Sequence, residues 1–226
     1  MPAGVTLRGA GAFVTTIRGP GSGNVVTLGD GSVLEGFTVT GAGQGYWDCG
    51  VFSADGASPT VRHNRLTGNG VGFGAYCFGS GCANRPVVTN NVVVGNAVQG
   101  IAAHGIALTA LNNTVWGGKR GIAVDVAGAV IRGNVVGENE WTGIGGAEGQ
   151  DVAYNDVWHA GTPYDKAAPG DGALAADPAF VDAAKGDYRL GSASPCIDAG
   201  DPAPERRDAD GSRGDMGAYG GPSPMP

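Results

Sequence analysis

The sequence has few of the features that mark several common classes of protein. Charged residues make up 15% and aromatic residues 7% of the 226 positions. No apolar run reaches the roughly 18 residues that a membrane-spanning helix needs, so no transmembrane segment is predicted. Neither G-x-S-x-G, H-E-x-x-H nor a complete G-x-G-x-x-G occurs, so three common signatures of enzymes and dinucleotide-binding domains are absent.

Basic residues are scarce and unevenly placed. The chain has 14 Lys and Arg against 21 Asp and Glu, and a formal net charge of −7. Residues 1–160 carry eight basic and ten acidic side chains, whereas residues 161–226 carry six and eleven. Because no basic stripe is available to neutralise phosphates, nucleic acid is not expected as a partner.

Cysteine is rare, and its four positions form no zinc-binding pattern. There is no C-x-x-C pair and no histidine close in sequence to a cysteine. The segment "CFGSGC" (77–82) has a spacing that allows a small disulfide loop, which would indicate an oxidising compartment. Four unpaired thiols, at Cys49, Cys77, Cys82 and Cys196, are the alternative.

The first residues, "MPAGVTLRGAG", lack the charged and apolar regions of a signal peptide. They read as the middle of a repeat with a Met in front. We therefore expect a preceding segment, with an export signal, to be missing from this chain.

Glycine, by contrast, is abundant, and it occurs in a repeat. The asparagines of four "N-x-V" triplets, at 91, 113, 134 and 155, are spaced by 22, 21 and 21 residues, and Asn64 lies 27 residues before the first of them. Each unit holds three short β-type runs without helical periodicity, and it offers Val, Ile and Ala where a leucine-rich repeat needs Leu. Such units bury their apolar residues only by stacking, as a coil of three parallel strands that rises about 4.8 Å per turn. The asparagines would then form a ladder of hydrogen-bonded amides at one corner.

Two consecutive units, "GIAAHGIALTALNNTVWGGKR" from Gly100 and "GIAVDVAGAVIRGNVVGENEW" from Gly121, show the repeat most clearly. They resemble the right-handed parallel β-helix of the pectate-lyase-like superfamily, across roughly residues 5–160. The elements "DPAF", "DYRL", "SPCIDAG" and "DMGAY" within 177–220 resemble the closing segment of bacterial secreted, often surface-anchored β-helix proteins.

The predicted fold is therefore all-β. We expect a single-stranded right-handed parallel β-helix of about seven coils of 21–22 residues in residues 1–160. An irregular acidic segment, 161–226, is expected to belong to the same domain and to pack on the last coil. The resemblance implies an extracellular or cell-surface protein that faces a polysaccharide, although the fold alone does not define the activity.

One face of the predicted coil carries small residues and a few ionisable groups. Alternation in "GIAVD" places Ala123 and Asp125 outward, and in "GIAAH" it places Ala102 and His104 outward. His104 and Asp125 would be cross-strand neighbours roughly 5 Å apart. Such a face suits an open sugar-binding groove, to which Phe52 would also point. A solvated sheet face on which His and Asp happen to pair is the alternative.

The corner before this strand carries aromatic and basic residues. "YWDC", "GGKR" and "NEWT" place Trp47, Lys119, Arg120 and Trp141 along one edge of the face. Aromatic rings stack on sugars, and cations bind the carboxylates of acidic sugars. The longer coil contains an insertion within "VGFGAYCFGSGCANR" that would wall the groove or form a capped bulge.

The resemblance also implies a chemistry. Related lyases hold calcium with clustered carboxylates and use an Arg or Lys base to remove the C5 proton of a uronic acid. Here the implied calcium ligands are Asp55, Asp125 and Glu148, and the implied base is Lys119, Arg120 or Arg132. Hydrolysis by Asp125 and Glu148 is an alternative. In the tail, Asp208, Asp210 and Asp215 of "DADGSRGD" are interpreted as turn formers, with a structural calcium site as the alternative.

The leading hypothesis is an extracellular protein that binds or processes an acidic polysaccharide. A non-catalytic surface, adhesion or scaffold protein is the alternative, so enzymatic activity is left open. The catalytic candidates are His104, Asp125, Lys119 and Arg120, and the substrate-binding candidates are Trp47, Phe52, Trp141 and Arg132.

Overall fold

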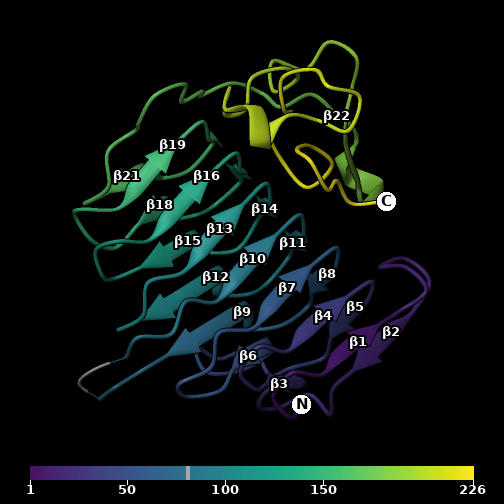
Figure 1. The fold of residues 1–226 in the computed structure, drawn as a ribbon, viewed down its shortest axis with the longest axis vertical. Helices are drawn as coiled ribbons and strands as arrows, with labels where there is room; N and C mark the ends of the chain where they lie inside the picture. Colours follow the sequence, from purple (N-terminus) through teal and green to yellow (C-terminus); the bar gives the residue numbers. More distant parts are fainter. Residues whose placement is uncertain (80–81) are drawn as a thin grey trace.

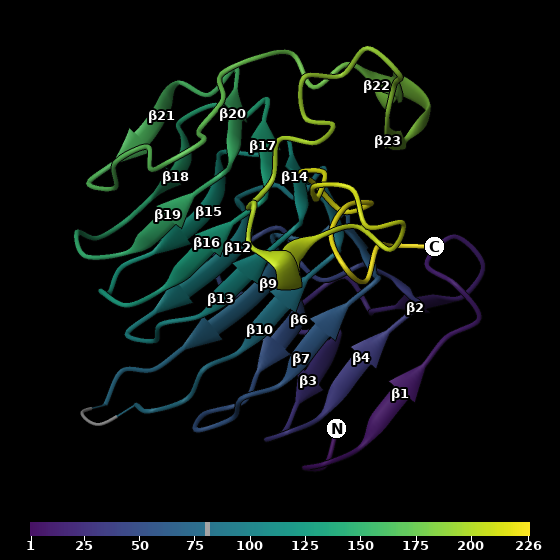
Figure 2. The ribbon, with the colours of Figure 1, turned by 45° about the horizontal axis from the view of Figure 1, so that its top comes forward.

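The chain folds into a solenoid in which three parallel sheets run along the molecule (Figures 1 and 2). The computed structural model describes residues 1–79 and 82–226. Each sheet holds seven strands, and neighbouring strands come from successive coils. The prediction of an all-β parallel coil with about seven turns is therefore confirmed. Within the described residues, no helix has the length and apolar character needed to cross a membrane.

The strands are short and are named here in their spatial order. Sheet A consists of β1 (Thr6–Arg8), β4 (Val33–Glu35), β7 (Thr60–Arg62), β10 (Val87–Thr89), β13 (Thr109–Leu111), β16 (Val130–Arg132) and β19 (Asp151–Ala153). Sheet B consists of β2 (Thr16–Arg18), β5 (Thr38–Thr40), β8 (Arg65–Thr67), β11 (Val92–Val94), β14 (Thr114–Trp116), β17 (Val135–Gly137) and β20 (Asp156–Trp158). Sheet C consists of β21 (Thr162–Asp165), β18 (Thr142–Gly145), β15 (Arg120–Val124), β12 (Gln99–His104), β9 (Val71–Tyr76), β6 (Cys49–Ser53) and β3 (Val26–Leu28). The C-terminal segment adds an antiparallel pair, β22 (Phe180–Asp182) and β23 (Asp187–Leu190), and the 3-10 helices η1 (Ala183–Lys185) and η2 (Pro204–Arg206).

Identical residues stack in the interior, as the repeat requires. Ile101 pairs with Ile122, which pairs with Ile144 in the next coil. All three side chains are fully buried in one apolar core between the three sheets. The alternation that predicted Ile122 inward is therefore confirmed.

The predicted asparagine ladder lies at the corner between sheets A and B. The amide of Asn113 donates to Asn134 Oδ1 at 3.0 Å, and the Asn113 backbone N–H donates to the same oxygen at 2.9 Å. The same pattern joins Asn64, Asn91, Asn134 and Asn155, all with no exposed surface. Each coil is thereby hydrogen-bonded to the next inside the structure, where an unpaired amide would be costly.

A second, incomplete ladder lies at the corner between sheets B and C. Asn69 donates its amide to Asn96 Oδ1 at 3.2 Å, and Asn139 occupies this corner two coils later. Gly118 stands in the coil between them, and Asn139 Oδ1 is buried without a partner. The asparagine of this ladder does not recur in every unit, so the sequence shows no period for it.

A glycine precedes each inward isoleucine of sheet C because inward valines of sheet B leave no room for a side chain at that position. A Cβ at Gly100 would lie 2.3 Å from Val115 Cγ1, and one at Gly121 would lie 2.4 Å from Val136 Cγ1. No side chain fits at these distances. The "G-I" signature of the repeat therefore has a packing origin.

Part of the C-terminal segment closes the last coil. β21, which lies within residues 161–226, is the last strand of sheet C. The Leu174 N–H donates to Asn155 O at 2.9 Å, and Leu174 O accepts from the Val157 N–H at 3.0 Å. These bonds satisfy backbone groups that the end of a parallel stack would otherwise leave unpaired.

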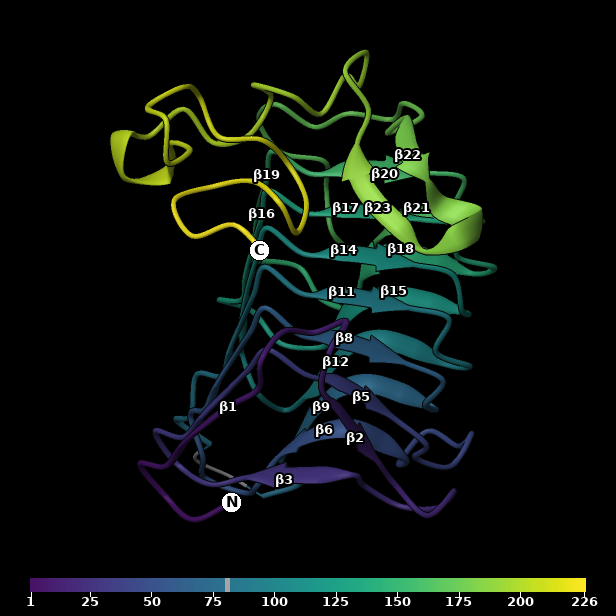
Figure 3. The ribbon, with the colours of Figure 1, turned by 90° about the vertical axis from the view of Figure 1, so that its right-hand side faces the viewer.

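The remainder of this segment lies beside the solenoid rather than above it. The β22–β23 hairpin packs on the outer face of sheet B, where the Phe180 ring meets the Trp116 ring edge-on at 5.1 Å (Figure 3). The chain then follows the corner between sheets A and B, and Asn90 Nδ2 donates to Ala218 O at 3.1 Å. The expectation that the segment packs on the last coil therefore covers only part of its contacts. The contacts between the C-terminal segment and the solenoid do not repeat along the chain, so no sequence pattern indicates them.

The cysteines take two roles. Cys77 and Cys82 form a disulfide, as the "CFGSGC" spacing allowed, whereas Cys49 and Cys196 are buried free thiols. Cys196 joins the C-terminal segment to the solenoid, because its Sγ donates to Asp156 Oδ2 at 3.3 Å and both side chains are buried.

The buried carboxyl group of Asp156 should make the free energy of unfolding depend on pH. Burial raises the pKa of its carboxyl group above the ordinary value of 3.8, so the native state holds this proton more tightly than the unfolded chain does. The stabilisation from the protonated form is complete below about pH 3.8 and is lost as pH rises through the raised pKa. The amide introduced by Asp156→Asn has no such proton. We therefore expect the free energy of unfolding of this variant, relative to the wild type, to increase between pH 4 and pH 7 in urea titrations. A difference that stays constant with pH would contradict this expectation.

Candidate functional site

The outer face of sheet C carries the small residues that the sequence predicted. Phe52, Gly74, Ala102, Ala123 and Gly145 follow one another in register across five strands. In this row of stacked residues, no side chain from Ala102 to Gly145 is larger than a methyl group. Ala102 and Gly145 are buried and Ala123 is partly exposed, so a ligand can reach this row of residues at Ala123.

His104 and Asp125 meet on this face, as predicted. His104 Nδ1 forms an ion-pair contact with Asp125 Oδ2, and Asp125 Oδ1 accepts the Gly105 N–H at 2.8 Å. The backbone amide orients the carboxylate, and the carboxylate orients the imidazole. His104 Nε2 is then the ring nitrogen available to a ligand, and 51% of the His104 side chain is exposed.

A small hollow of about 150 Å³ lies beside this pair. Its polar lining residues are Tyr76, Gln99, His104, Arg120 and Asp125. Gln99 and Arg120 are paired across β12 and β15, one strand length from the histidine and the aspartate. The hollow thus combines a permanent cation with an oriented imidazole, over a floor of alanines.

Trp141 and two cations border the face at one edge. Lys119 Nζ lies 4.8 Å and Arg120 Cζ lies 5.6 Å from the centre of the Trp141 ring. The predicted grouping of these three residues is therefore present in the structure. Among the described residues, neither cation forms a salt bridge with a carboxylate. Lys119 lines a different hollow, at the corner between sheets B and C, together with Glu138 and His159.

An aromatic cluster borders the hollow on the side of the earlier coils. The Trp47 ring lies 5.0 Å from Tyr76 and 5.6 Å from Phe78, and the Phe78 ring lies 5.2 Å from His104. The Tyr76 hydroxyl donates to Tyr46 O at 3.2 Å, and burial raises the pKa of Tyr76, so the phenol stays protonated. Trp47 lies at the same corner between sheets B and C as Trp141, but four coils earlier, so it belongs to a separate cluster.

The insertion supplies part of this cluster. Residues 71–76 form β9 of sheet C, and the disulfide-closed loop that follows carries Phe78. Tyr76 and Phe78 are the residues through which the insertion was expected to wall the groove, whereas Gln99 was not among the candidate site residues. Gln99 was detectable, because it precedes "GI" in the way that Arg120 does in the next unit.

The predicted calcium ligands are not brought together. Over residues 1–79 and 82–226, no three His, Cys, Asp or Glu side chains are placed so that they could hold a metal ion. Asp125 contacts His104, Asp55 lines a separate pocket, and Glu148 is exposed on the loop after β18. The sequence spacing places Asp125 and Glu148 on neighbouring coils but does not define the direction of loop residues, and Asp55 lies three coils before Asp125.

The aspartates of "DADGSRGD" act as turn residues. Asp208 Oδ2 accepts the Asp215 N–H at 3.0 Å, and Asp210 Oδ1 accepts the Ser212 N–H at 2.9 Å. Asp215 Oδ1 accepts the Asp198 N–H at 2.8 Å. These contacts support the turn interpretation rather than a calcium loop.

The expectation that Arg132 contacts a ligand on the sheet C face is wrong. Arg132 lies on β16 in sheet A, not on the outer face of sheet C, because "AVIRG" forms the next strand of the coil. Its guanidinium binds Asp151 at 2.8 Å and Asp201 at 2.6 Å. Arg132 therefore holds the C-terminal segment against the solenoid and is not positioned to bind a ligand on the sheet C face.

The fold and this face define a class of protein, a stacked-coil solenoid with one open sheet. Residues 14–115 match the family model described as right handed beta helix region. Together with the three parallel sheets, this match identifies the chain as a right-handed parallel β-helix repeat protein. No curated protein and no solved structure matches it.

Proposed function

We propose that the chain binds an acidic polysaccharide across the outer face of sheet C and cleaves it there by β-elimination. The oriented His104–Asp125 pair, with Arg120 in the same hollow, is the observation that carries this proposal. Trp141 and Trp47, on opposite sides of the hollow, offer aromatic faces on which neighbouring sugar rings stack.

The roles follow from the chemistry of a uronic acid. Arg120, at the other end of the hollow from His104, pairs with the carboxylate of a neighbouring sugar and holds the polymer on this face. His104 Nε2 accepts the C5 proton, and Asp125 stabilises the resulting imidazolium. The C4–O bond breaks with its electron pair leaving on oxygen, a double bond forms between C4 and C5, and water protonates the leaving oxygen.

An extracellular or cell-surface location is part of the proposal. The Cys77–Cys82 disulfide supports it, since such bonds persist in oxidising compartments.

Release of unsaturated uronide from pectate, alginate and glycosaminoglycans, followed by absorbance, tests the proposal. We expect product from at least one polymer, and we expect Arg120→Gln to lower kcat/KM about 10–100-fold because a charged hydrogen bond is lost. Arg18→Gln, which removes an exposed arginine on sheet B, is the matched control and should leave kcat/KM unchanged. No product on any acidic polymer would rule out the lyase.

A non-catalytic glycan-binding protein is the second candidate. The exposure of Trp47 (60%) and Phe78 (72%) favours it, since exposed aromatic rings suit sugar binding without chemistry. In that case the polymers would be retained in affinity electrophoresis, and Trp47→Ala would release them, while no uronide appeared.

A further inference from the structure

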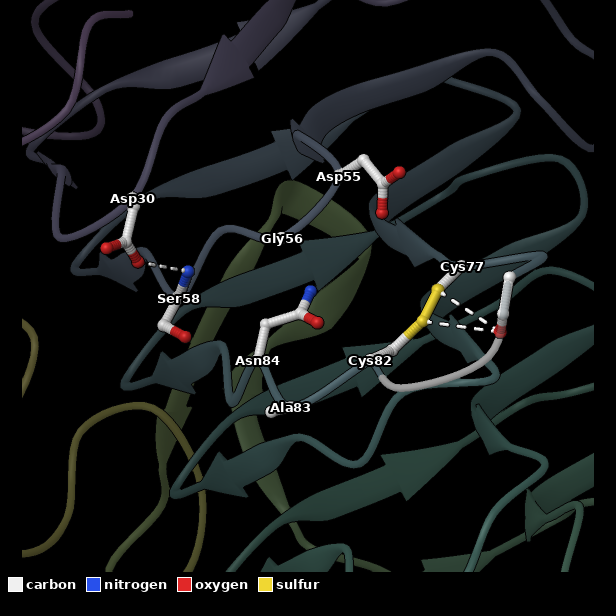
Figure 4. A pocket seen from close by; sticks show the side chains of 9 residues that line it. Asp30, Asp55, Gly56, Ser58, Cys77, Cys82, Ala83 and Asn84 are labelled. Atoms are coloured by element: carbon white, nitrogen blue, oxygen red, sulfur yellow. Dashed lines mark hydrogen bonds between the residues drawn. A yellow bond between two sulfur atoms is a disulfide. The ribbon is translucent and has the colours of Figure 1, made fainter.

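A second hollow, of about 560 Å³, lies at the corner between sheets C and A (Figure 4). Residues from the turns of three successive coils line it: Asp30 after β3, Asp55, Gly56 and Ser58 after β6, and Cys77, Gly79, Cys82, Ala83 and Asn84 after β9. It shares no lining residue with the hollow beside His104. Any binding there is therefore independent of the proposed lyase activity.

The lining of this hollow is acidic. It contains the carboxylates of Asp30 and Asp55 and no Lys, Arg or His. Asp30 Oδ1 accepts the Ser58 N–H at 2.9 Å, and its second oxygen accepts no hydrogen bond from the residues that the structure describes. In the described part of the chain, neither carboxylate has a cationic partner, so the hollow favours a positively charged occupant.

Asn84 adds an independent indication of a ligand. Asn84 is 6% exposed, and within residues 1–79 and 82–226 neither Oδ1 nor Nδ2 has a hydrogen-bond partner. Figure 4 shows the amide turned toward the space bordered by Asp55 and the disulfide. Since a buried amide without partners is costly, a group that both donates and accepts hydrogen bonds is expected to meet it. A hydroxyl group does both, whereas an ammonium group or a bare metal ion cannot accept from Nδ2.

We propose that the Asp30–Asp55–Asn84 hollow binds a small hydroxylated amine, of the kind represented by an amino sugar with a free amino group. The ammonium group pairs with the Asp55 carboxylate, in a hollow where Asp30 adds a second negative charge, and a hydroxyl group pairs with both atoms of the Asn84 amide. The volume is in the range of pockets for small organic ligands, which are generally about 300–1,000 Å³.

Calorimetric titration of the folded chain with D-glucosamine, D-glucose and calcium chloride, each alone, tests this assignment. We expect D-glucosamine to bind at least about tenfold more tightly than D-glucose, because only the amine meets the carboxylates. Asp55→Asn and Asn84→Ala should each weaken D-glucosamine binding about tenfold or more. Asp171→Asn removes an exposed carboxylate outside the hollow and should leave the affinity unchanged.

Three results would overturn the proposal. Equal binding of D-glucose and D-glucosamine would remove the role of the carboxylates. Binding of calcium with no binding of D-glucosamine would replace the amine with a metal ion. An unchanged affinity in Asp55→Asn, which alters an exposed residue and should not affect folding, would place any binding outside this hollow.

Discussion

His104→Gln should lower kcat for uronide release about 10²–10⁴-fold, the contribution expected from a positioned general base. Glutamine keeps most of the volume of the histidine, so the face of sheet C is preserved, but its amide does not take up a proton near neutral pH. KM should change little, because Arg120, Trp47 and Trp141 still bind the polymer. Initial rates over a range of polymer concentrations separate the two parameters.

Asp125→Asn tests the orientation of the imidazole. The asparagine amide would donate to His104 Nδ1 or rotate away, and either change removes the acceptor that fixes the proton on Nδ1. We expect a loss of kcat similar to that of His104→Gln, together with little further loss in the double variant, because the two residues act as a unit.

The chain contains a matched control for both variants. His159 Nδ1 lies 2.9 Å from Glu138 Oε1, in a second exposed histidine–carboxylate pair at the corner between sheets B and C. His159→Gln should leave kcat unchanged, since this pair does not face the hollow beside Arg120. Equal losses in His104→Gln and His159→Gln would show that an oriented imidazole on the sheet C face is not the base.

Most of the fold was predictable from the periodicity of the sequence. A spacing of 21 residues between Asn113 and Asn134 defines both a coil length and the residue that lies above each residue. For this reason the pairing of His104 with Asp125 followed from counting alone. The inward and outward directions on sheet C followed from alternation, which the parallel register preserves from coil to coil.

Features without a period were not predictable in the same way. The direction of Tyr76 depends on the space above Gly74, and the contact of Arg132 depends on Asp201, which is 69 residues away. The C-terminal segment covers the outer face of sheet B through contacts such as Phe180 with Trp116. Because these contacts join non-repeating residues, only the folded chain displays them.

Asn113→Ala should lower the free energy of unfolding by about 4 kcal/mol or more, since a buried amide and its partners lose about 1–3 kcal/mol per bond and the effects are not fully additive. The amide donates to Val88 O, Leu111 O and Asn134 Oδ1 at 2.9–3.0 Å. Its oxygen accepts the backbone and side-chain N–H groups of Asn91, both at 3.1 Å. Urea unfolding measures the loss, and the shape of the transition shows whether the stack still unfolds as one unit.

Asn139→Ala is the matched control, because it removes the same side chain from a similarly buried site. Among the residues that the structure describes, the Asn139 side chain donates only to Gly117 O, at 3.1 Å, and its Oδ1 has no partner. The loss should therefore be about 1 kcal/mol, the net contribution of a single hydrogen bond. Equal losses at the two positions would mean that the asparagines stabilise the corners by filling volume. A several-fold larger loss at Asn113 would show that the ladder stabilises the solenoid through its hydrogen bonds, and that each coil depends on its neighbour for them.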